Sequence, residues 1–457
     1  MRCIDFSSGR ATVRGPRDHG GAGVRTSSKR EFLFLQGLAG SFFSRLGRAL
    51  DEAGHGVHRV NFNGGDKLCW RLPGAVDYRF GLRRWPAFLE KLFAERGITD
   101  VVLFGDCRPL HAEAIRIARR HGLQVHVFEE GYIRPDFVTL EVGGVNGHSA
   151  LARDAEHYLE TARNLPAMPV FPGVPSSFSR RAWEDIGYNV AGLALAPLFP
   201  GYRTHRPWNI LIEYLGWGAR LLRKRAAQQR SSARLAALAA DGRPYFIFPL
   251  QLDCDYQIRV HSPFSGMQPA IERVLGSFAT YAPANTLLVV KEHPLDNGLT
   301  DWMRRTRKVA ERLGILDRLV FIEWGDIDQL VRPALGLVTV NSTTGTLSLR
   351  HGVPTKVLGD AVYDVPRVTD QAPLDTFWSA PTAPDMAAFD AFCRVLIDRC
   401  LIHGGYFSEE GLAMLTAGAL ARLEAAPMVA PSARLAPERS TPQTSAPTSI
   451  RPMPAGG

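Results

Sequence analysis

Residues 100–135 read DVVLFGDCRPLHAEAIRIARRHGLQVHVFEEGYIRP, and this stretch decides the predicted fold. An apolar run at Asp100–Phe104 is followed by a helical pattern at Leu110–His121 and by a second apolar run at Gln124–Phe128. Short apolar strands that alternate with helices are typical of a parallel sheet covered by helices on both faces. We therefore predict a Rossmann-like unit in this part of the chain.

The same alternation continues on both sides of this stretch. Upstream, a strand pattern at Glu31–Gly37 leads into a helical pattern at Ser41–Gly54 and a second strand at Val57–Phe62. Downstream, a second run is predicted, with strands at Tyr245–Pro249, Thr286–Val290, Leu319–Ile322, Gly336–Val340 and Thr355–Leu358 and helices at Asp301–Leu313 and Thr344–His351. Two Rossmann-like domains that face a cleft form a GT-B arrangement. The predicted fold class is therefore α/β and GT-B-like.

The composition divides the chain into five parts. Residues 1–30 are rich in Gly, Arg and Ser and predict a flexible basic arm, and residues 426–457 are rich in Ala, Pro, Ser and Thr and predict a disordered tail. The N-terminal Rossmann-like domain is expected at 31–190 and the C-terminal one at 241–425. Residues 191–240 differ from both and form a basic, aromatic helical segment between the domains.

The net charge and the cysteine content indicate which partners, metal sites and cellular compartment to expect. The net charge of +9 and the pI of about 9.4 favour an anionic partner. The six cysteines are scattered, without CxxC pairs or Cys/His metal spacing, which argues against a disulfide framework or a zinc site and favours a reducing compartment. We find no motif for nucleic-acid binding, no signal peptide and no apolar run of about 18 residues, so a cytoplasmic location is expected.

The segment between the domains combines apolar and basic residues. Trp208 and Trp217 lie among leucines, and the basic residues between Arg203 and Arg234 are opposed only by Glu213. One interpretation is an interdomain helix with a solvated basic face. The other is docking on an anionic membrane, where tryptophan lies at headgroup level and arginine meets phosphate.

Two adjacent carboxylates end the opening stretch. Glu129 and Glu130 run into a glycine turn at the carboxyl end of a strand, where open α/β sheets bind ligands. Adjacent acids repel, so one can hold a raised pKa and act as acid or base, or one can act as a nucleophile. The alternative is an ordinary charged loop. Asp106, after the preceding strand, is a further catalytic candidate, and Arg134 is expected in the cleft.

Two strand-end loops of the second run suit an anion. Lys291 and His293 directly follow an apolar strand, and Pro294 fixes the turn after them. A histidine there can donate to a phosphate, and lysine adds positive charge; the alternative is a surface histidine in a polar loop.

The second loop of this kind leads from a strand into a helix through Asn341, Ser342, Thr343 and Thr344. Hydroxyls and free helix N–H groups can cradle an anion there. Simple N-capping is the alternative, and both can hold at once.

Four polar positions have a weaker pattern. Gln36 lies in a glycine-bearing turn after the first strand, where a substrate can approach the backbone. Gln251, Asp253 and Gln257 surround an Asp-x-Asp string, which could hold a divalent metal. Because the two-domain pattern points away from the metal-dependent GT-A fold, we expect these side chains to face the cleft and expect no metal.

Taken together, these motifs resemble capsule polysaccharide proteins of the KpsS/LipB type. The resemblance covers about residues 31–370. The runs that carry it, in this order, are Phe34–Gly37, Asn61–Asp66, Phe104–Pro109, Glu129–Pro135, Gln251–Gln257, Lys291–Pro294 and Asn341–Gly345.

The resemblance implies a retaining β-Kdo glycosyltransferase that uses CMP-Kdo as its donor and needs no metal or other cofactor. Such an enzyme begins a Kdo linker on a lysophosphatidylglycerol acceptor at the inner face of the inner membrane. Other capsule assembly or export proteins are further implied partners. A non-catalytic export adaptor, or a transferase of another nucleotide sugar such as a UDP-linked one, remains as an alternative.

A further similarity to bacterial sialyltransferases implies roles for single residues. Glu129 or Glu130 would be the catalytic carboxylate. His293, with Ser342 and Thr343, would hold the phosphate of CMP. The first domain would then bind the acceptor and carry the catalytic group, and the second would bind the nucleotide sugar.

Overall fold

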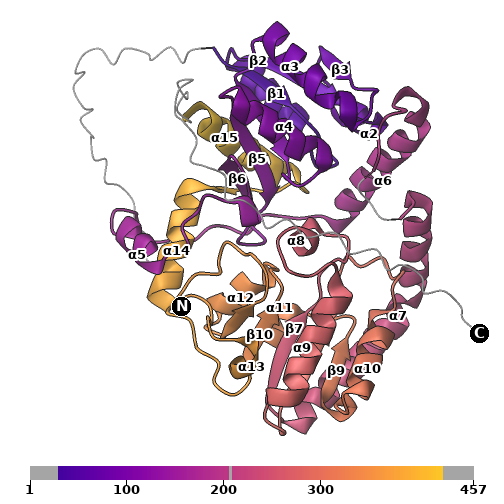
Figure 1. The fold of residues 1–457 in the computed structure, drawn as a ribbon, viewed down its shortest axis with the longest axis vertical. Coiled ribbons are helices and arrows are strands. Elements are labelled where there is room, and N and C mark those ends of the chain that lie inside the picture. Colours follow the sequence, from indigo (N-terminus) through magenta and orange to yellow (C-terminus); the bar gives the residue numbers. More distant parts are fainter. Residues whose placement is uncertain (1–28, 205–207, 426–457) are drawn as a thin grey trace, which may run out of the picture.

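The computed structural model describes residues 29–204 and 208–425, which form two α/β halves, one above the other in Figure 1. The first half has a seven-stranded sheet in the order β12-β6-β5-β4-β1-β2-β3, in which β1 to β5 run parallel and β6 and β12 run antiparallel to their neighbours. Its strands are β1 (Glu31–Phe34), β2 (Gly56–Asn61), β3 (Ala75–Asp77), β4 (Asp100–Phe104), β5 (Gln124–Glu130), β6 (Phe137–Val142) and β12 (Leu401–His403).

Helices cover both faces of this sheet. Alternate residues of β1 point to opposite sides: Leu33 packs with α3 (Trp85–Arg96) and α4 (Pro109–Arg120), whereas Phe32 and Phe34 pack with α1 (Phe42–Glu52) and α15 (Glu409–Ala425). The central strand β4 is buried along its whole length, as its apolar sequence predicts. The helices before the second sheet are α1 (Phe42–Glu52), α2 (Gly64–Cys69), η1 (Leu82–Arg84), α3 (Trp85–Arg96), α4 (Pro109–Arg120), η2 (Asn146–His148), α5 (Ala155–Ala162), α6 (Phe178–Ala194), η3 (Ala196–Leu198) and α7 (Ile210–Asp241).

The second half has a fully parallel five-stranded sheet in the order β11-β10-β7-β8-β9. Helices α9, α10 and α13 pack on one face, and α7 and α11 pack on the other. Its strands are β7 (Tyr245–Pro249), β8 (Leu287–Lys291), β9 (Leu319–Ile322), β10 (Gly336–Thr339) and β11 (Thr355–Val357). The remaining helices are α8 (Tyr256–Arg259), α9 (Met267–Tyr281), α10 (Trp302–Arg312), η4 (Leu316–Arg318), α11 (Ile327–Val331), α12 (Thr344–Arg350), α13 (Leu374–Phe377), α14 (Met386–Arg399) and α15 (Glu409–Ala425).

These two parallel-sheet halves confirm the predicted α/β, GT-B-like fold class. The end of the chain differs from the predicted division, because β12 pairs with β6 and α15 packs against α1. Residues 401–425 therefore belong to the first half, although we expected the C-terminal domain to extend to residue 425. This return of the chain to the first half is stabilised by the apolar side chains of α15, which cover one face of the first sheet.

The predicted basic arm ends before residue 30. Arg30 is buried and forms an ion pair with Asp100, which also accepts a bond of 2.7 Å from His126. A buried charge needs such a partner, and this pair fixes the start of β1. The rest of the arm (1–28) and the tail (426–457) lie outside the described residues.

The predicted interdomain segment 191–240 is divided between several elements. It contains the end of α6, η3 and most of α7, which ends at Gly242 with a positive φ of 69°. The C-terminal part of helix α7 packs against the second sheet through Leu238. Within the described parts of the chain, no helix is both long and apolar enough to cross a membrane.

Candidate functional site

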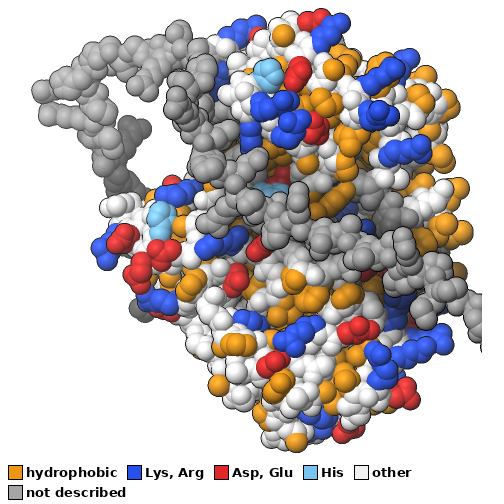
Figure 2. Space-filling view, viewed as in Figure 1, with side chains coloured by type: hydrophobic (Ala, Val, Ile, Leu, Met, Phe, Trp, Pro, Cys, Tyr) orange, Lys and Arg blue, Asp and Glu red, His pale blue; other side chains and the backbone are white. Residues whose placement is uncertain are grey.

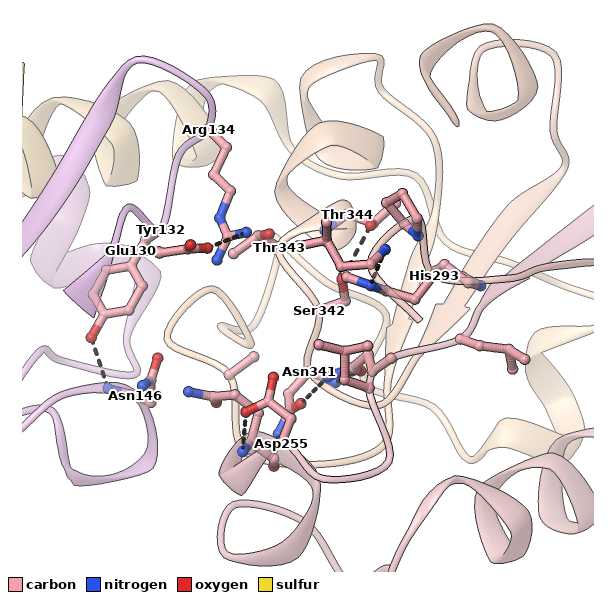
Figure 3. Close-up of a pocket in the computed structure, with 18 of the residues that line it drawn as sticks. Glu130, Tyr132, Arg134, Asn146, Asp255, His293, Asn341, Ser342, Thr343 and Thr344 are labelled. Atoms are coloured by element: carbon pink, nitrogen blue, oxygen red, sulfur yellow. Dashed lines mark hydrogen bonds and ion pairs between the residues drawn. The ribbon is translucent and has the colours of Figure 1, made fainter. Parts of the chain in front are cut away.

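A cleft of about 470 Å³ lies between the two halves. It is bordered by the carboxyl ends of β5 in the first sheet and of β7, β8 and β10 in the second, which is where parallel α/β sheets bind ligands. In Figure 3, Glu130 and Arg134 on one side face Ser342, Thr343 and Thr344 on the other. Of the predicted site residues, those that line the cleft are Glu129, Glu130, Arg134, Gln251, Gln257, Lys291, His293, Pro294, Asn341, Ser342, Thr343 and Thr344.

The two acids of the first half lie in different electrostatic surroundings. Glu130 lies 2.7 Å from Arg134 and 3.2 Å from Arg181, and these positive charges hold its pKa below the usual range. Burial raises the pKa of Glu129 to about 8, and its Oε1 accepts a bond of 2.9 Å from the N–H of Glu130. At neutral pH, Glu130 is therefore a carboxylate, whereas Glu129 is mostly a protonated acid.

Glycine is required directly after this pair. A Cβ atom at Gly131 would lie 2.0 Å from the carbonyl oxygen of Phe137. The close approach of the two backbone segments brings the turn back onto β6, and thereby leaves Glu130 and Arg134 at the edge of the cleft.

On the opposite side, His293 is neutral and has a defined tautomer. Burial, with the positive charge of Arg134 nearby, lowers the pKa of His293 to about 4. Its Nδ1 accepts a bond of 3.1 Å from the backbone N–H of Leu295. The single proton of the imidazole is then on Nε2, which is available as a donor to a ligand in the cleft.

Lys291 and Glu292 lie next to this histidine, and burial weakens the charge of both. The pKa of Lys291 is lowered to about 8, and that of Glu292 is raised to about 7. The Lys291 ammonium donates to the carbonyl oxygen of Glu292 at 2.9 Å, while the Glu292 carboxylate lies 3.3 Å from Arg220 of α7. Lys291 thus lines the cleft, while its ammonium group also donates a hydrogen bond to a backbone carbonyl oxygen.

The hydroxyl-rich loop after β10 is positioned by Gln251. Its amide forms a reciprocal pair with Asn341, donating at 2.9 Å to Oδ1 and accepting at 3.1 Å from the backbone N–H. Ser342 Oγ accepts from the Thr344 N–H at 3.2 Å and lies 3.1 Å from the Thr344 hydroxyl. The N-cap residue of α12 is Thr343, whose side chain makes no capping hydrogen bond, so the predicted capping interaction is not seen. The bond from the Thr344 N–H to Ser342 instead arranges the two hydroxyl groups side by side in the cleft wall.

Three predicted residues lie elsewhere. Gln36 is buried and holds Tyr188 of α6 at 2.7 Å, because the turn after β1 points toward α6. Asp106 is also buried, and its Oδ2 accepts from the Val145 N–H at 3.0 Å. Asp253 accepts from the Met267 N–H at 2.7 Å at the start of α9. Within the described chain these three side chains support loops and do not line the cleft.

The cleft also contains residues that we did not predict. Arg181 comes from α6, where an Arg-Arg pair has no feature that distinguishes it from a solvated surface. Asp255, two positions after Asp253 in the Asp-x-Asp string, lines the cleft, caps α8 by accepting from the Gln257 N–H at 3.0 Å, and has a pKa raised by burial. The Asp-x-Asp string thus contributes a carboxylate to the cleft, but this carboxylate is Asp255 and not the predicted Asp253.

The site combines groups that suit transfer of an anionic, activated group. An ionised carboxylate lies beside an acid that titrates near neutral pH, and a neutral imidazole donor and two adjacent hydroxyls lie across the cleft. Two arginines supply positive charge.

We expected no metal from the sequence, yet one group of the described side chains, Asp106, Cys107, His148 and His261, has its ligand atoms within 4.8 Å of one another, outside the cleft lining.

Comparison with known proteins identifies the family. Residues 99–407 match the family described as capsule polysaccharide biosynthesis protein. Over 383 residues the chain is 34% identical to the capsule polysaccharide export protein KpsS of Escherichia coli, covering 83% of this chain and 97% of that protein. The capsule polysaccharide modification protein LipB of Neisseria meningitidis is 35% identical over 389 residues, covering 84% and 93%.

Comparison with solved structures gives a weaker similarity. KpsC of Thermosulfurimonas dismutans, a β-Kdo 2,7 transferase, is 15% identical, with a TM-score of 0.40 and coverage of 79% of this chain and 89% of that one. The family match and the two curated relatives span most of both halves and include the cleft loops, which confirms the resemblance found in the sequence. The chain belongs to the capsule polysaccharide biosynthesis protein family.

Proposed function

We propose that this protein is a β-Kdo transferase, which uses CMP-Kdo to begin a Kdo linker on a lysophosphatidylglycerol acceptor. The observation that carries the proposal is the pairing of Glu129 and Glu130, in two protonation states, with the donor groups of His293 and the Ser342 loop across one cleft. Membership of a capsule polysaccharide family supports the pathway. A non-catalytic export adaptor would not need this arrangement of acids and donors.

The charges of the donor fit the cleft. CMP-Kdo carries a phosphate and a sugar carboxylate. We assign the phosphate to the Nε2–H of His293 and the hydroxyls of Ser342 and Thr343, with the Thr344 hydroxyl beside that of Ser342. Arg134 and Arg181 lie beside Glu130 and are assigned to the sugar carboxylate, because arginine binds carboxylates through two parallel hydrogen bonds.

We propose a double displacement through Glu130. Its carboxylate attacks the anomeric carbon of Kdo, the bond from that carbon to the phosphate oxygen breaks, and CMP leaves. The acceptor hydroxyl then attacks the same carbon, the bond to Glu130 breaks, and Glu129 takes the hydroxyl proton. Two inversions convert the β-linked donor into a β product.

The direct test is mass spectrometry of a reaction that contains the purified protein, CMP-Kdo and lysophosphatidylglycerol. We expect a lipid product heavier by one or more Kdo units, together with free CMP. UDP-linked sugars in parallel reactions should give no product. If no product forms with CMP-Kdo although CMP binds, the non-catalytic export adaptor would be favoured. If product forms with a UDP-linked sugar, that sugar and not CMP-Kdo would be the donor.

We also propose that one flank of the protein docks on the anionic inner face of the inner membrane. Large apolar side chains are exposed on α6 and α7, including Trp183 (72% exposed), Leu215 (74%) and Leu222 (88%). Figure 2 shows hydrophobic side chains gathered along the edge where α6 lies in Figure 1. Exposed basic neighbours on α7 are Arg223, Lys224 and Arg225. Apolar and basic residues side by side are typical of interfacial binding.

Arg220, within the same basic run, does not take part in this surface. Its side chain is 8% exposed, pairs with Glu292 and lies over the ring of Trp324 at 5.2 Å. Arg220 therefore stabilises the packing of α7 on the second half.

The test of membrane docking is co-sedimentation with phosphatidylglycerol vesicles, with residues 1–28 removed from every protein because that basic arm would bind them too. Glutamine at Arg223, Lys224 and Arg225 should reduce binding, and salt should do the same, because it screens such attraction beyond about 8 Å. The matched control carries glutamine at three exposed basic residues of α10, Arg304, Arg307 and Lys308. Equal binding by the two triple variants would refute the proposed surface.

A further inference from the structure

Four side chains with metal-binding chemistry meet beside the cleft. Asp106 and Cys107 lie in the loop after β4, His148 lies in η2, and His261 follows α8 in the second half. Cys107 Sγ lies 3.2 Å from His261 Nε2 and 3.1 Å from Asp106 Oδ1, and His148 Nδ1 lies 3.1 Å from Asp106 Oδ2. The two imidazole rings meet edge to face with centroids 4.8 Å apart.

The transfer reaction does not account for this group. None of the four lines the cleft, and the proposed mechanism uses none of them. A surface interaction does not explain it either, because Asp106 and His261 are buried and Cys107 is only partly exposed. Imidazole, thiolate and carboxylate groups, here brought together from both halves, are instead the side chains that bind zinc in proteins.

The geometry fits a tetrahedral ion. Bonds of about 2.0–2.3 Å from zinc to nitrogen, oxygen and sulfur place neighbouring ligand atoms about 3.3–3.8 Å apart. The ligand atoms here already lie within 4.8 Å of one another, with the closest pairs near that spacing. One thiolate and one carboxylate balance the charge of the cation. His148 is half-exposed, which gives an ion a route from solvent.

The surroundings hold the ligands in place. Asp106 Oδ2 accepts from the Val145 N–H at 3.0 Å, which fixes the carboxylate and leaves Oδ1 beside Cys107. A Cβ atom at residue 147 would lie 2.3 Å from Nδ1 of His261, so Gly147 leaves the space that the ring occupies. Supporting contacts of this kind orient metal ligands.

We propose that Asp106, Cys107, His148 and His261 bind one Zn²⁺ ion that ties the two halves together. Three ligands come from the first half and His261 comes from the second. The carbonyl oxygen of His261 accepts from the Asn341 side chain at 3.0 Å, so the ion also stabilises the loop assigned to the donor. Its role is structural, because four protein ligands leave no open position. The expectation of a metal-independent transfer reaction is compatible with this site.

Cobalt titration of the full-length, untagged protein tests the site without any donor or acceptor, and so independently of the proposed function. After treatment with a chelator, one equivalent of Co²⁺ should give a near-ultraviolet thiolate-to-cobalt charge-transfer band and visible bands of a tetrahedral ion. Cys107→Ser should remove the charge-transfer band. Cys254→Ser, at an exposed cysteine outside the group, should keep it.

His148→Ala is a second variant, at a half-exposed position where loss of folding is not expected. It should bind Co²⁺ at least about 10-fold more weakly. The wild-type protein should also melt at a higher temperature with Zn²⁺ than after chelation, whereas Cys107→Ser should not respond. Absence of the charge-transfer band in the wild type, or an unchanged band in folded Cys107→Ser, would overturn the proposal.

Discussion

Replacing His293 by alanine should weaken CMP binding without disturbing the fold. The Leu295 N–H donates to Nδ1 of this histidine, which leaves Nε2–H as the group assigned to the phosphate. The pKa of about 4 means that the ring donates as a neutral group over the whole physiological range.

The magnitude follows from the type of hydrogen bond that is lost. A neutral donor to a charged phosphate contributes about 1–3 kcal/mol, because the bond is charge-assisted at one end. At about 1.4 kcal/mol for each factor of ten, His293→Ala should raise the Kd of CMP by about 5- to 150-fold. The ratio of mutant to wild-type Kd should stay constant from pH 6 to pH 8, because His293 does not titrate there. A histidine of ordinary pKa would instead lose its charge in this range, and the ratio would shrink as pH rises.

Isothermal calorimetry of CMP with wild-type, His293→Ala and His121→Ala proteins gives this comparison. His121 is exposed at the end of α4 and serves as the matched control, with an expected Kd equal to that of the wild type. Unchanged CMP affinity in folded His293→Ala would refute the assignment of the phosphate. A ratio that falls between pH 6 and pH 8 would refute the neutral imidazole.

Other predictions follow from the acids and from the buried ion pair. Glu130→Gln should lower kcat by several orders of magnitude while CMP still binds, as measured by product formation and calorimetry; a near-normal rate would exclude it as the nucleophile. Because Glu129 accepts a proton only when ionised, kcat should rise with pH and level off above about pH 8. A kcat that instead falls as the pH rises through about 8 would show that Glu129 acts as a general acid. Arg30→Met leaves Asp100 buried without its ion pair and should lower the free energy of unfolding in urea by about 3–5 kcal/mol. Lys29→Met, at an exposed neighbour, is the control, and an equal effect of both would show that the pair is not the cause.

Most of the fold could be predicted because its strands have a strong local pattern. Predicted and observed limits are the same at Asp100–Phe104, Tyr245–Pro249 and Leu319–Ile322, where each strand is a short, mostly apolar run. The return of the chain to the first sheet could not be predicted in this way. Leu401–His403 is too short to give a periodic pattern, and its position depends on the packing of α15.

The cleft loops could be predicted for a topological reason. Carboxyl ends of parallel strands meet at one edge of a sheet, so polar residues at or just beyond the ends of β8 and β10 had to lie at one edge of the second sheet, and those at the end of β5 at one edge of the first. Which neighbouring residue faces the cleft depends on turn geometry. Asp253 turns away to hold the start of α9, whereas Asp255 begins α8 and faces the cleft, and both conformations suit the same Asp-x-Asp string.

The contribution of α6 illustrates what local patterns leave out. Tyr188 of this helix forms hydrogen bonds with Gln36, Asn63 and Asp66 of the first half, and these bonds help to hold α6 where Arg181 lies next to Glu130. Gln36, predicted as a polar residue of the cleft, thus affects the site through the helix that it holds. Gln36 is therefore a positioning residue: its loss would remove one of the bonds that hold α6, weaken the Arg181 contact and let the pKa of Glu130 rise, although Arg134 would still lower it and Gln36 itself lies outside the cleft.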